Sequence, residues 1–271
     1  VRKRAVPDWL NRAMQFTEAQ ISQWLAGFIW PLLRIGSMMM SAPIFSTRQI
    51  PVRFRMLLAV LVTLLVQPVL PDAPVVAVFS PDALLIAVQQ IAIGVALGFL
   101  MQMAFQALIF GGQVMAYSMG LGFANMMDPT NGVQVPVVSQ FWLILAMLAF
   151  VMMNGHLVLL SAIVDTFSVL PVATDGLTRA GAWELLSWAS RMFAAGVLMA
   201  LPVIISLLLI NVGMGVVSRA APQLNIFAIG FPITLLMGFL LIWMTLPQVM
   251  TGFGGLVTEA FDRSAIVLGT R

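Results

Sequence analysis

The stretch "ALLIAVQQIAIGVALGFLMQMAFQALIFGGQVMAYS", residues 83–118, contains no charged side chain. A helix that crosses a bilayer needs only about 20 predominantly apolar residues. The charge-free run continues to residue 127, and three other runs are also longer than a span: 129–164, 192–218 and 220–258. Hydrophobic residues make up 61% of the chain and charged residues 8%, against about 25% charged in an ordinary soluble domain. The chain is therefore predicted to be an integral membrane protein.

The fold class predicted from these runs is all-α. The strands of a membrane β-barrel alternate polar and apolar residues over about 10 positions, whereas the runs in this chain are apolar without alternation. Short breaks rich in Pro, Gly and Asn divide the sequence into about six long segments. The expected segments are 18–46, 56–70, 83–118, 137–164, 183–218 and 224–261.

Several of these segments do not look like simple membrane spans. The stretch between Arg55 and Asp72 would rise only about 24 Å as a helix, which is short of a hydrocarbon core of about 30 Å. Segments 183–218 and 224–261 are far longer than one span requires. The positive-inside bias is weak as well. Either one segment is misplaced, or several helices pack against other protein subunits and not against lipid.

Composition argues against most kinds of chemistry. The chain has no Cys and therefore no thiolate metal site, and its net charge of +3 forms no basic stripe for nucleic acid. His156 is the only histidine, and no set of metal ligands surrounds it in sequence. Ser139 and Asp165 lack the motif of a serine hydrolase, so His156 is expected to be a hydrogen-bonded residue at a helix end. We expect no enzyme activity, no cofactor and no metal.

Two arginines, Arg34 and Arg191, interrupt apolar segments. An arginine at the centre of a membrane helix costs roughly 2.5–3.5 kcal/mol on insertion scales, so each is expected to meet a carboxylate, a carbonyl or water. Glu184 lies seven residues before Arg191 on nearly the same helix face and is the expected partner. A structural pin between subunits and a proton relay both remain open as roles for such residues.

Glycines inside the apolar segments favour close helix packing. Gly94 and Gly98 form a G-x-x-x-G pair, and Gly111 and Gly112 follow on the same segment. Small residues at this spacing let helix backbones approach each other in membranes. Because no reactive group accompanies them, these glycines are predicted to serve assembly.

The stretch "MGLGFANMMDPTNGVQVP", residues 119–136, is a polar loop between two apolar segments. Irregular backbone at membrane depth is tolerated only where it is buried in protein or lines a cavity. Gly120 and Gly122 provide backbone freedom, Phe123 provides apolar bulk, and Asp128-Pro129 is a turn signal. The loop is therefore predicted to lie inside a protein-lined pore, with an ordinary interhelical connector as the alternative.

Five motifs resemble the FliR family of flagellar export-gate proteins and occur in the order found in that family. They are "FIWPLLRIGSMMMSAPIF" (28–45), "IPVRFR" (50–55), "GLGFANMMDP" (120–129), "NGHL" (154–157) and "RAAPQLNIFAIGFP" (219–232). The resemblance covers nearly the whole chain. The first residues, 1–16, form a basic extension beyond the family's usual start.

The resemblance implies a non-enzymatic, inner-membrane subunit of the type III flagellar export apparatus in the bacterial basal body. In this family one FliR joins five FliP and four FliQ subunits, FlhB docks on this core, FlhA lies beneath it, and unfolded flagellar substrates pass through. The core would be raised from the bilayer plane toward the periplasm, with membrane lipid as a further partner. The implied division is a FliP-like part at 17–182, a FliQ-like hairpin at 183–261 and a C-terminal tail at 262–271.

The resemblance also assigns roles to residues. The loop would plug the closed pore through Met119, Gly120, Leu121, Gly122, Phe123, Ala124, Asn125, Met126, Met127, Asp128 and Pro129. Helix packing and assembly would involve Gly94, Gly98, Gly111, Gly112, Arg34, Arg191, Arg219, Pro222 and Asn225.

Two other functions stay open at this point. The family has injectisome members, so an export-gate subunit of a virulence secretion system is the first alternative. A small-molecule secondary transporter is a more distant one, because such carriers bind substrate at broken helices near the midplane and Arg34 and Arg191 lie within apolar segments.

Overall fold

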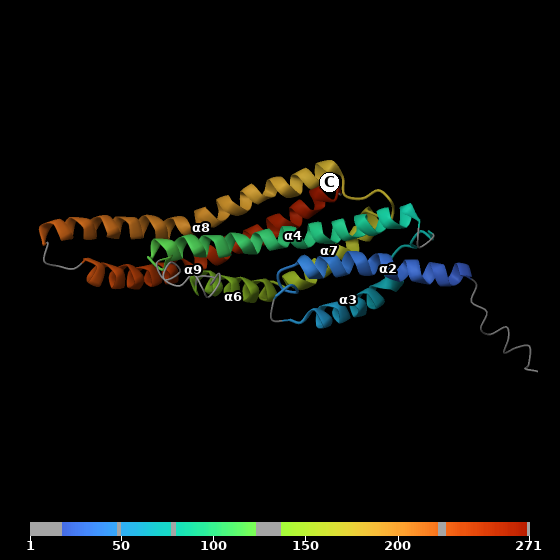
Figure 1. Ribbon diagram of the computed structural model, residues 1–271, viewed down its shortest axis with the longest axis horizontal. Helices are drawn as coiled ribbons and strands as arrows, with labels where there is room; N and C mark the ends of the chain where they lie inside the picture. Colours follow the sequence, from blue (N-terminus) through green and yellow to red (C-terminus); the bar gives the residue numbers. More distant parts are fainter. Residues whose placement is uncertain (1–17, 48–49, 77–79, 123–136, 222–225, 270–271) are drawn as a thin grey trace, which may run out of the picture.

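A computed structural model describes residues 18–47, 50–76, 80–122, 137–221 and 226–269. These residues form helices joined by turns and short connections, with no strand among them, so the all-α prediction is confirmed (Figure 1). The helices are α2 (Glu18–Ser41), α3 (Val52–Val66), the 3-10 turn η1 (Gln67–Val69), α4 (Pro81–Ser118), α6 (Val137–Met152), α7 (Gly155–Val169), α8 (Arg179–Ala220) and α9 (Ile226–Val267).

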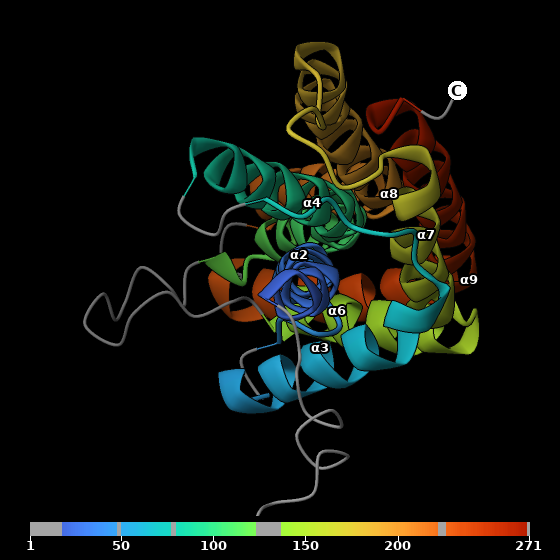
Figure 2. The same ribbon diagram turned by 90° about the vertical axis from the view of Figure 1, so that its right-hand side faces the viewer.

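Helix α4, which contains the charge-free run 83–118, is the centre of the molecule. Helices α2, α6, α8 and α9 all pack against it, and the end-on view in Figure 2 shows α4 between α8 and α2. Its start follows ordinary helix rules, because the Ser80 side chain accepts a hydrogen bond from the Ala83 N–H at 3.1 Å and Pro81 occupies the first helical position. Most side chains in the second half of α4 are buried, whereas Leu84, Val88 and Ile91 belong to an exposed apolar face on its first half.

Several helices differ in length from a single membrane span. Helices α8 and α9 each have 42 residues, or about 63 Å at ~1.5 Å per residue, which is twice the hydrocarbon thickness of about 30 Å. Helix α3 has 15 residues and rises only about 22 Å. Within the described residues, four helices are long and apolar enough to cross a membrane, or five with one bent pair, and α2 is not among them.

The bent pair corrects one expected segment. Residues 137–164 were predicted as one run, but the chain breaks into α6 and α7, which meet at 66°. The break falls at Asn154, whose φ of 56° lies in the left-handed region. Gly155 follows because a Cβ there would lie within 2.8 Å of the Phe150 ring. Uniform hydrophobicity in this run concealed a turn that two residues define.

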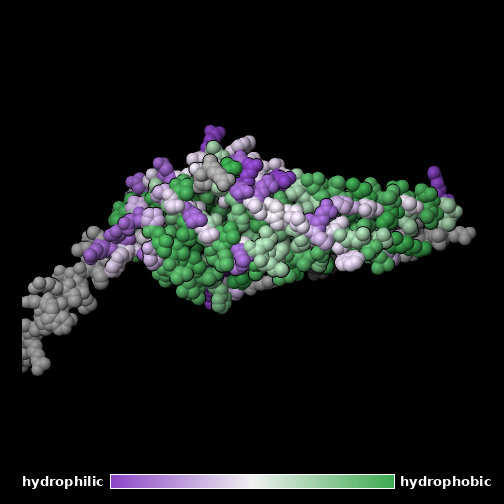
Figure 3. All heavy atoms as spheres, turned by 180° about the vertical axis from the view of Figure 1, so that it is seen from behind, coloured by the Kyte–Doolittle hydropathy of each residue, from purple (hydrophilic) through white to green (hydrophobic). Residues whose placement is uncertain are grey.

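Helices α8 and α9 form a long antiparallel hairpin that extends beyond the other helices (Figure 1). Its helices are longer than the expected 183–261, because α8 already begins at Arg179, capped by the Thr178 hydroxyl, which accepts from the Gly181 N–H at 3.0 Å. At the other end, α9 continues to Val267, into the expected C-terminal tail. Seen from behind, hydrophobic side chains cover much of the protruding hairpin (Figure 3).

Candidate functional site

Arg34 is fully buried and joins three helices. Its Nε donates to Gln90 Oε1 of α4 at 2.7 Å, and its Nη1 donates to the Thr166 hydroxyl of α7 at 3.1 Å. Its Nη2 donates to the carbonyl of Leu170, just after α7, at 2.9 Å. The guanidinium also lies 4.0 Å from the centroid of the Phe167 ring, a cation–π contact. No carboxylate of a described residue pairs with it, so its partners are a carbonyl, an amide and a hydroxyl.

The glycine pair Gly94 and Gly98 lets α2 approach α4. A Cβ on Gly94 would collide with the Arg34 carbonyl and the Ser37 hydroxyl. A Cβ on Gly98 would collide with the Ser41 hydroxyl and would lie 2.8 Å from the Met38 carbonyl oxygen. The contact that this pair makes in the described structure is therefore within the chain, between α2 and α4, while a role in assembly stays a prediction.

The second pair, Gly111 and Gly112, admits two other helices. A Cβ on Gly111 would lie 2.7 Å from the Gly196 carbonyl oxygen of α8, and one on Gly196 would lie 2.6 Å from the Ala107 oxygen. A Cβ on Gly112 would lie 2.6 Å from the Trp142 indole of α6. Gly196 was not predicted from the sequence as a packing residue. A glycine within an apolar run was the feature that could have indicated it.

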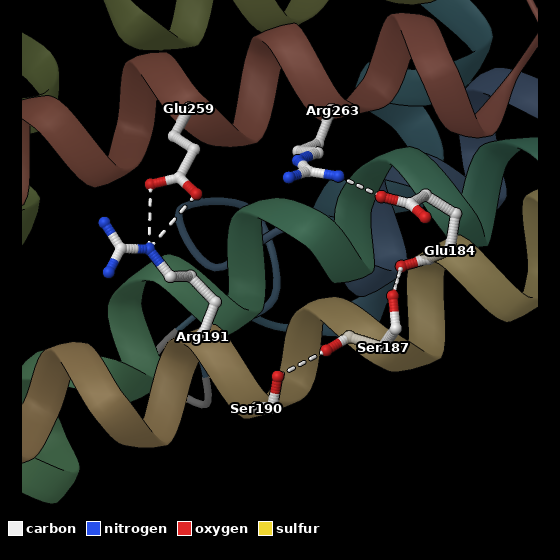
Figure 4. Close-up of polar contacts among 6 residues, drawn as sticks. All are labelled: Glu184, Ser187, Ser190, Arg191, Glu259 and Arg263. Carbon is white, nitrogen blue, oxygen red and sulfur yellow. Dashed lines mark hydrogen bonds and ion pairs between the residues drawn. The ribbon is translucent and has the colours of Figure 1, made fainter.

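Two ion pairs connect the base of the α8–α9 hairpin (Figure 4). Arg191 Nε contacts both oxygens of Glu259, at 3.2 and 3.1 Å, and Arg263 pairs with Glu184. The expected pair of Glu184 with Arg191 is wrong. Two helical turns separate these residues by about 10 Å along the axis, while the antiparallel hairpin brings an opposite charge from α9 to each of them.

A signal for these pairs was present in the sequence. Arg191 and Glu259 lie at nearly equal distances before and after the turn at 221–225, and so do Glu184 and Arg263. The side chains are 28–48% exposed, so each pair contributes modestly. Ser187 and Ser190 donate to backbone carbonyls of α8 and take no part in them.

We expect Arg191→Glu to lower the free energy of unfolding by about 1 kcal/mol, because two carboxylates would then face each other across the hairpin. The double variant Arg191→Glu with Glu259→Arg should recover most of the loss. Thermal unfolding of the detergent-solubilised chain measures both, with Arg219→Glu, an exposed arginine without a described partner, as the control. Equal effects of Arg191→Glu and Arg219→Glu would contradict the pairing.

The start of the loop is a defined helix end. Gly120 has a φ of 82°, its N–H bonds the Tyr117 carbonyl, and the Leu121 N–H bonds the Ala116 carbonyl, each at 3.0 Å. This pair of bonds is a Schellman motif with glycine at the left-handed position. Met119 is fully buried against Gly238 of α9, where a Cβ would lie 2.6 Å from the Met119 side chain. The hairpin and the loop are thus joined at this point.

The remaining predicted residues are placed only in part. Leu121 packs against the core and Gly122 lies beside the Tyr117 ring, while Arg219 is exposed in the last turn of α8. Predicted residues outside the described part of the chain are Phe123, Ala124, Asn125, Met126, Met127, Asp128, Pro129, Pro222 and Asn225.

The candidate histidine chemistry gains no support from the structure. His156 lies in the first turn of α7, as expected for a helix-end residue, but its buried Nδ1 has no hydrogen-bond partner among the described residues. The Ser139 hydroxyl, also buried, has none either. No group of three or more potential metal ligands occurs within the described residues.

Comparison with known proteins matches most of the chain to bacterial export proteins. A family model described as bacterial export proteins, family 1, matches residues 25–260. The flagellar biosynthetic protein FliR of Escherichia coli strain K12 is 41% identical over 257 residues, covering 94% of this chain and 97% of that protein. FliR of Pectobacterium carotovorum is 38% identical with the same coverage, and FliR of Bacillus subtilis strain 168 is 27% identical over 79% of this chain and 84% of that protein.

Proposed function

Since this chain belongs to the FliR family of bacterial export proteins, we propose that it forms a protein-export channel with FliP and FliQ subunits. It is a flagellar export-gate subunit with several apolar helices suited to a membrane. The finer proposal is that residues 17–182 take a FliP-like place, that the α8–α9 hairpin takes a FliQ-like place, and that loop 119–136 plugs the closed pore at the inner membrane.

The apolar surface of α8 carries the assembly part of this proposal. Large apolar side chains are exposed from Trp183, at 73%, to Val217, at 46%. This face is about 51 Å long at ~1.5 Å per residue, whereas a bilayer with its headgroups is about 40–45 Å thick. Lipid alone does not cover the full length of such a face on an upright helix, and large exposed apolar patches mark protein or membrane interaction sites. Neighbouring subunits on the hairpin supply the missing cover, which also fits a core partly raised from the bilayer.

The root of the loop supports the plug. The Schellman motif at Gly120 ends α4 sharply, and the buried Met119 fixes this end against the hairpin. The first residues of the loop are therefore held beside α9. Its apolar residues, Phe123, Met126 and Met127, have the flexible bulk that a seal between subunits requires. A channel for unfolded chains needs such a seal to keep ions from crossing at rest.

Deletion of residues 120–131 tests the plug and the assembly separately. We expect the variant chain, co-expressed with FliP and FliQ homologues, to be recovered with both in detergent, because the hairpin faces are unchanged. In planar bilayers its resting ion conductance should rise at least tenfold over that of the full-length complex.

The control uses Gly213, an exposed glycine of the hairpin. Beyond the backbone of its own helix, no atom lies within 4 Å of the position that a Cβ would take there. A complex containing Gly213→Ala should keep the low resting conductance. Unchanged conductance after the deletion would disprove the plug, while purification of the full-length chain without FliP and FliQ would disprove the shared channel.

A further inference from the structure

A groove beside the start of α3 combines an apolar wall with unpaired positive charge. It has a volume of about 290 Å³ and lies between α3, the end of α2 and the turn that joins them. Its lining is apolar apart from one arginine: Met39, Phe45, Ile50, Phe54, Arg55, Leu57, Leu58 and Leu61. We propose that an anionic phospholipid binds here, with its phosphate at Arg53 and Arg55 and one acyl chain in the groove.

The apolar wall is an unpartnered stripe of α3. Phe54, Leu57 and Leu61 are 64%, 56% and 54% exposed, and with Leu58 they follow the helical spacing that puts side chains on one face. Among the residues of α3, only Ala59 and Thr63 are buried. Most of this helix is therefore open to an apolar neighbour, such as a hydrocarbon chain along the groove.

Arg55 lines the groove and Arg53 precedes it by two residues on α3, and neither forms an ion pair with a described residue. Arg55 donates from Nε and Nη2 to the carbonyls of Ile50 and Thr47, which fixes its guanidinium in place, and no described residue pairs with its Nη1. Arg53 is exposed and has no described partner. The chain contains no acidic residue between Glu18 and Asp72. Two arginines in the first turn of α3, with no carboxylate partner among the described residues, favour an anionic ligand.

The length of α3 places these arginines near the headgroups. At about 22 Å, the helix is shorter than the hydrocarbon core, and a short helix is accommodated by local thinning and by flanking residues that reach the interface. Its N-terminal arginines would then lie at the level of lipid phosphates while the groove lies at the level of acyl chains. An apolar chain joined to an anionic head matches both parts of the site, whereas a neighbouring protein helix would satisfy only the apolar part.

The test measures lipid retained by the purified complex of this chain with FliP and FliQ. After exchange into mixed micelles that contain phosphatidylglycerol or phosphatidylcholine, native mass spectrometry counts the lipids bound and gives apparent affinities. We expect the complex to retain phosphatidylglycerol in preference to phosphatidylcholine. The variant Arg53→Gln should weaken its binding about fivefold, from about 1 kcal/mol per arginine near a membrane surface.

Two matched controls separate this site from general lipid contact. Arg179→Gln removes an exposed arginine at the start of α8, far along the chain from the groove, and should leave retention unchanged. Leu61→Gln, inside the groove, should weaken binding, whereas Leu65→Gln on the same helix, 79% exposed and outside the groove lining, should not.

Equal retention of the two lipids, or equal effects of Arg53→Gln and Arg179→Gln, would overturn the proposal. Lipid selectivity that is present for the chain alone but lost in the complex would mean that a protein subunit covers the groove, and would overturn it as well. If the chain is purified together with FliP and FliQ but shows no lipid selectivity, the lipid site is disproved and the proposed export channel is not. The two proposals can therefore fail separately.

Discussion

Replacement of Gly98 by leucine is expected to prevent α2 from packing on α4 and to lower the free energy of unfolding by about 4 kcal/mol or more. The Cβ alone would lie 2.8 Å from the Met38 carbonyl oxygen and 2.9 Å from the Ala42 nitrogen. The first is a backbone atom of α2, and the second belongs to the residue directly after it, whose N–H bonds the same Met38 carbonyl, so neither can move without the helix. A leucine side chain adds further volume to a contact between helices that is already closed, so α2 must separate from the centre of the molecule.

The matched control is Gly213→Leu, the same substitution on α8. No heavy atom lies within 4 Å of a Cβ built at Gly213, so this variant should gain up to about 1 kcal/mol from leucine's higher helix propensity. Thermal unfolding of the single chain in detergent, followed by tryptophan fluorescence, measures both. Gly98→Ala should fall between them, with a loss of about 1–3 kcal/mol. If the Gly98→Leu and Gly213→Leu chains unfold at the same temperature, α2 does not pack on α4 in this way.

Arg34→Lys, although it retains the positive charge, is expected to lower the free energy of unfolding by about 3 kcal/mol or more. The guanidinium of Arg34 reaches an amide, a hydroxyl and a carbonyl on two other parts of the chain at the same time, and a planar fork suits such divergent acceptors. A single ammonium cannot reach all of them. The remaining contacts would leave a buried charge poorly solvated, which is the costly case for charges in protein interiors.

Arg53→Lys is the control for this prediction. Arg53 is exposed and has no described partner, so the same exchange there should change stability by less than about 0.5 kcal/mol. Detergent unfolding curves of the two variants give the comparison directly. If both melt at the wild-type temperature, the three hydrogen bonds of Arg34 do not contribute to the stability of the fold.

Much of the fold was predictable because membrane-length apolar runs and their interruptions are properties of the sequence alone. The all-α class, the short helix α3 and the over-long hairpin helices follow from the count of residues between charges and turns. The break at Asn154 was missed because only two residues define it inside a uniformly apolar run. The prediction that Glu184 pairs with Arg191 was wrong because it considered only residues of α8. The antiparallel helix α9 supplies the partner of each.

What the sequence determined by itself was which parts of the chain avoid water, where the backbone can turn and, through five ordered motifs, the family. Such features are local or cumulative along the chain. Only the tertiary structure decided that Arg34 bonds α4 and α7, that Gly111 meets Gly196, and that Met119 rests on Gly238. These contacts join residues tens of positions apart, and they depend on the angle and register at which α2, α8 and α9 meet α4. Nearly uniform hydrophobicity does not indicate this register, because the sequence of a helix that is apolar on every side does not show which face packs against a neighbour.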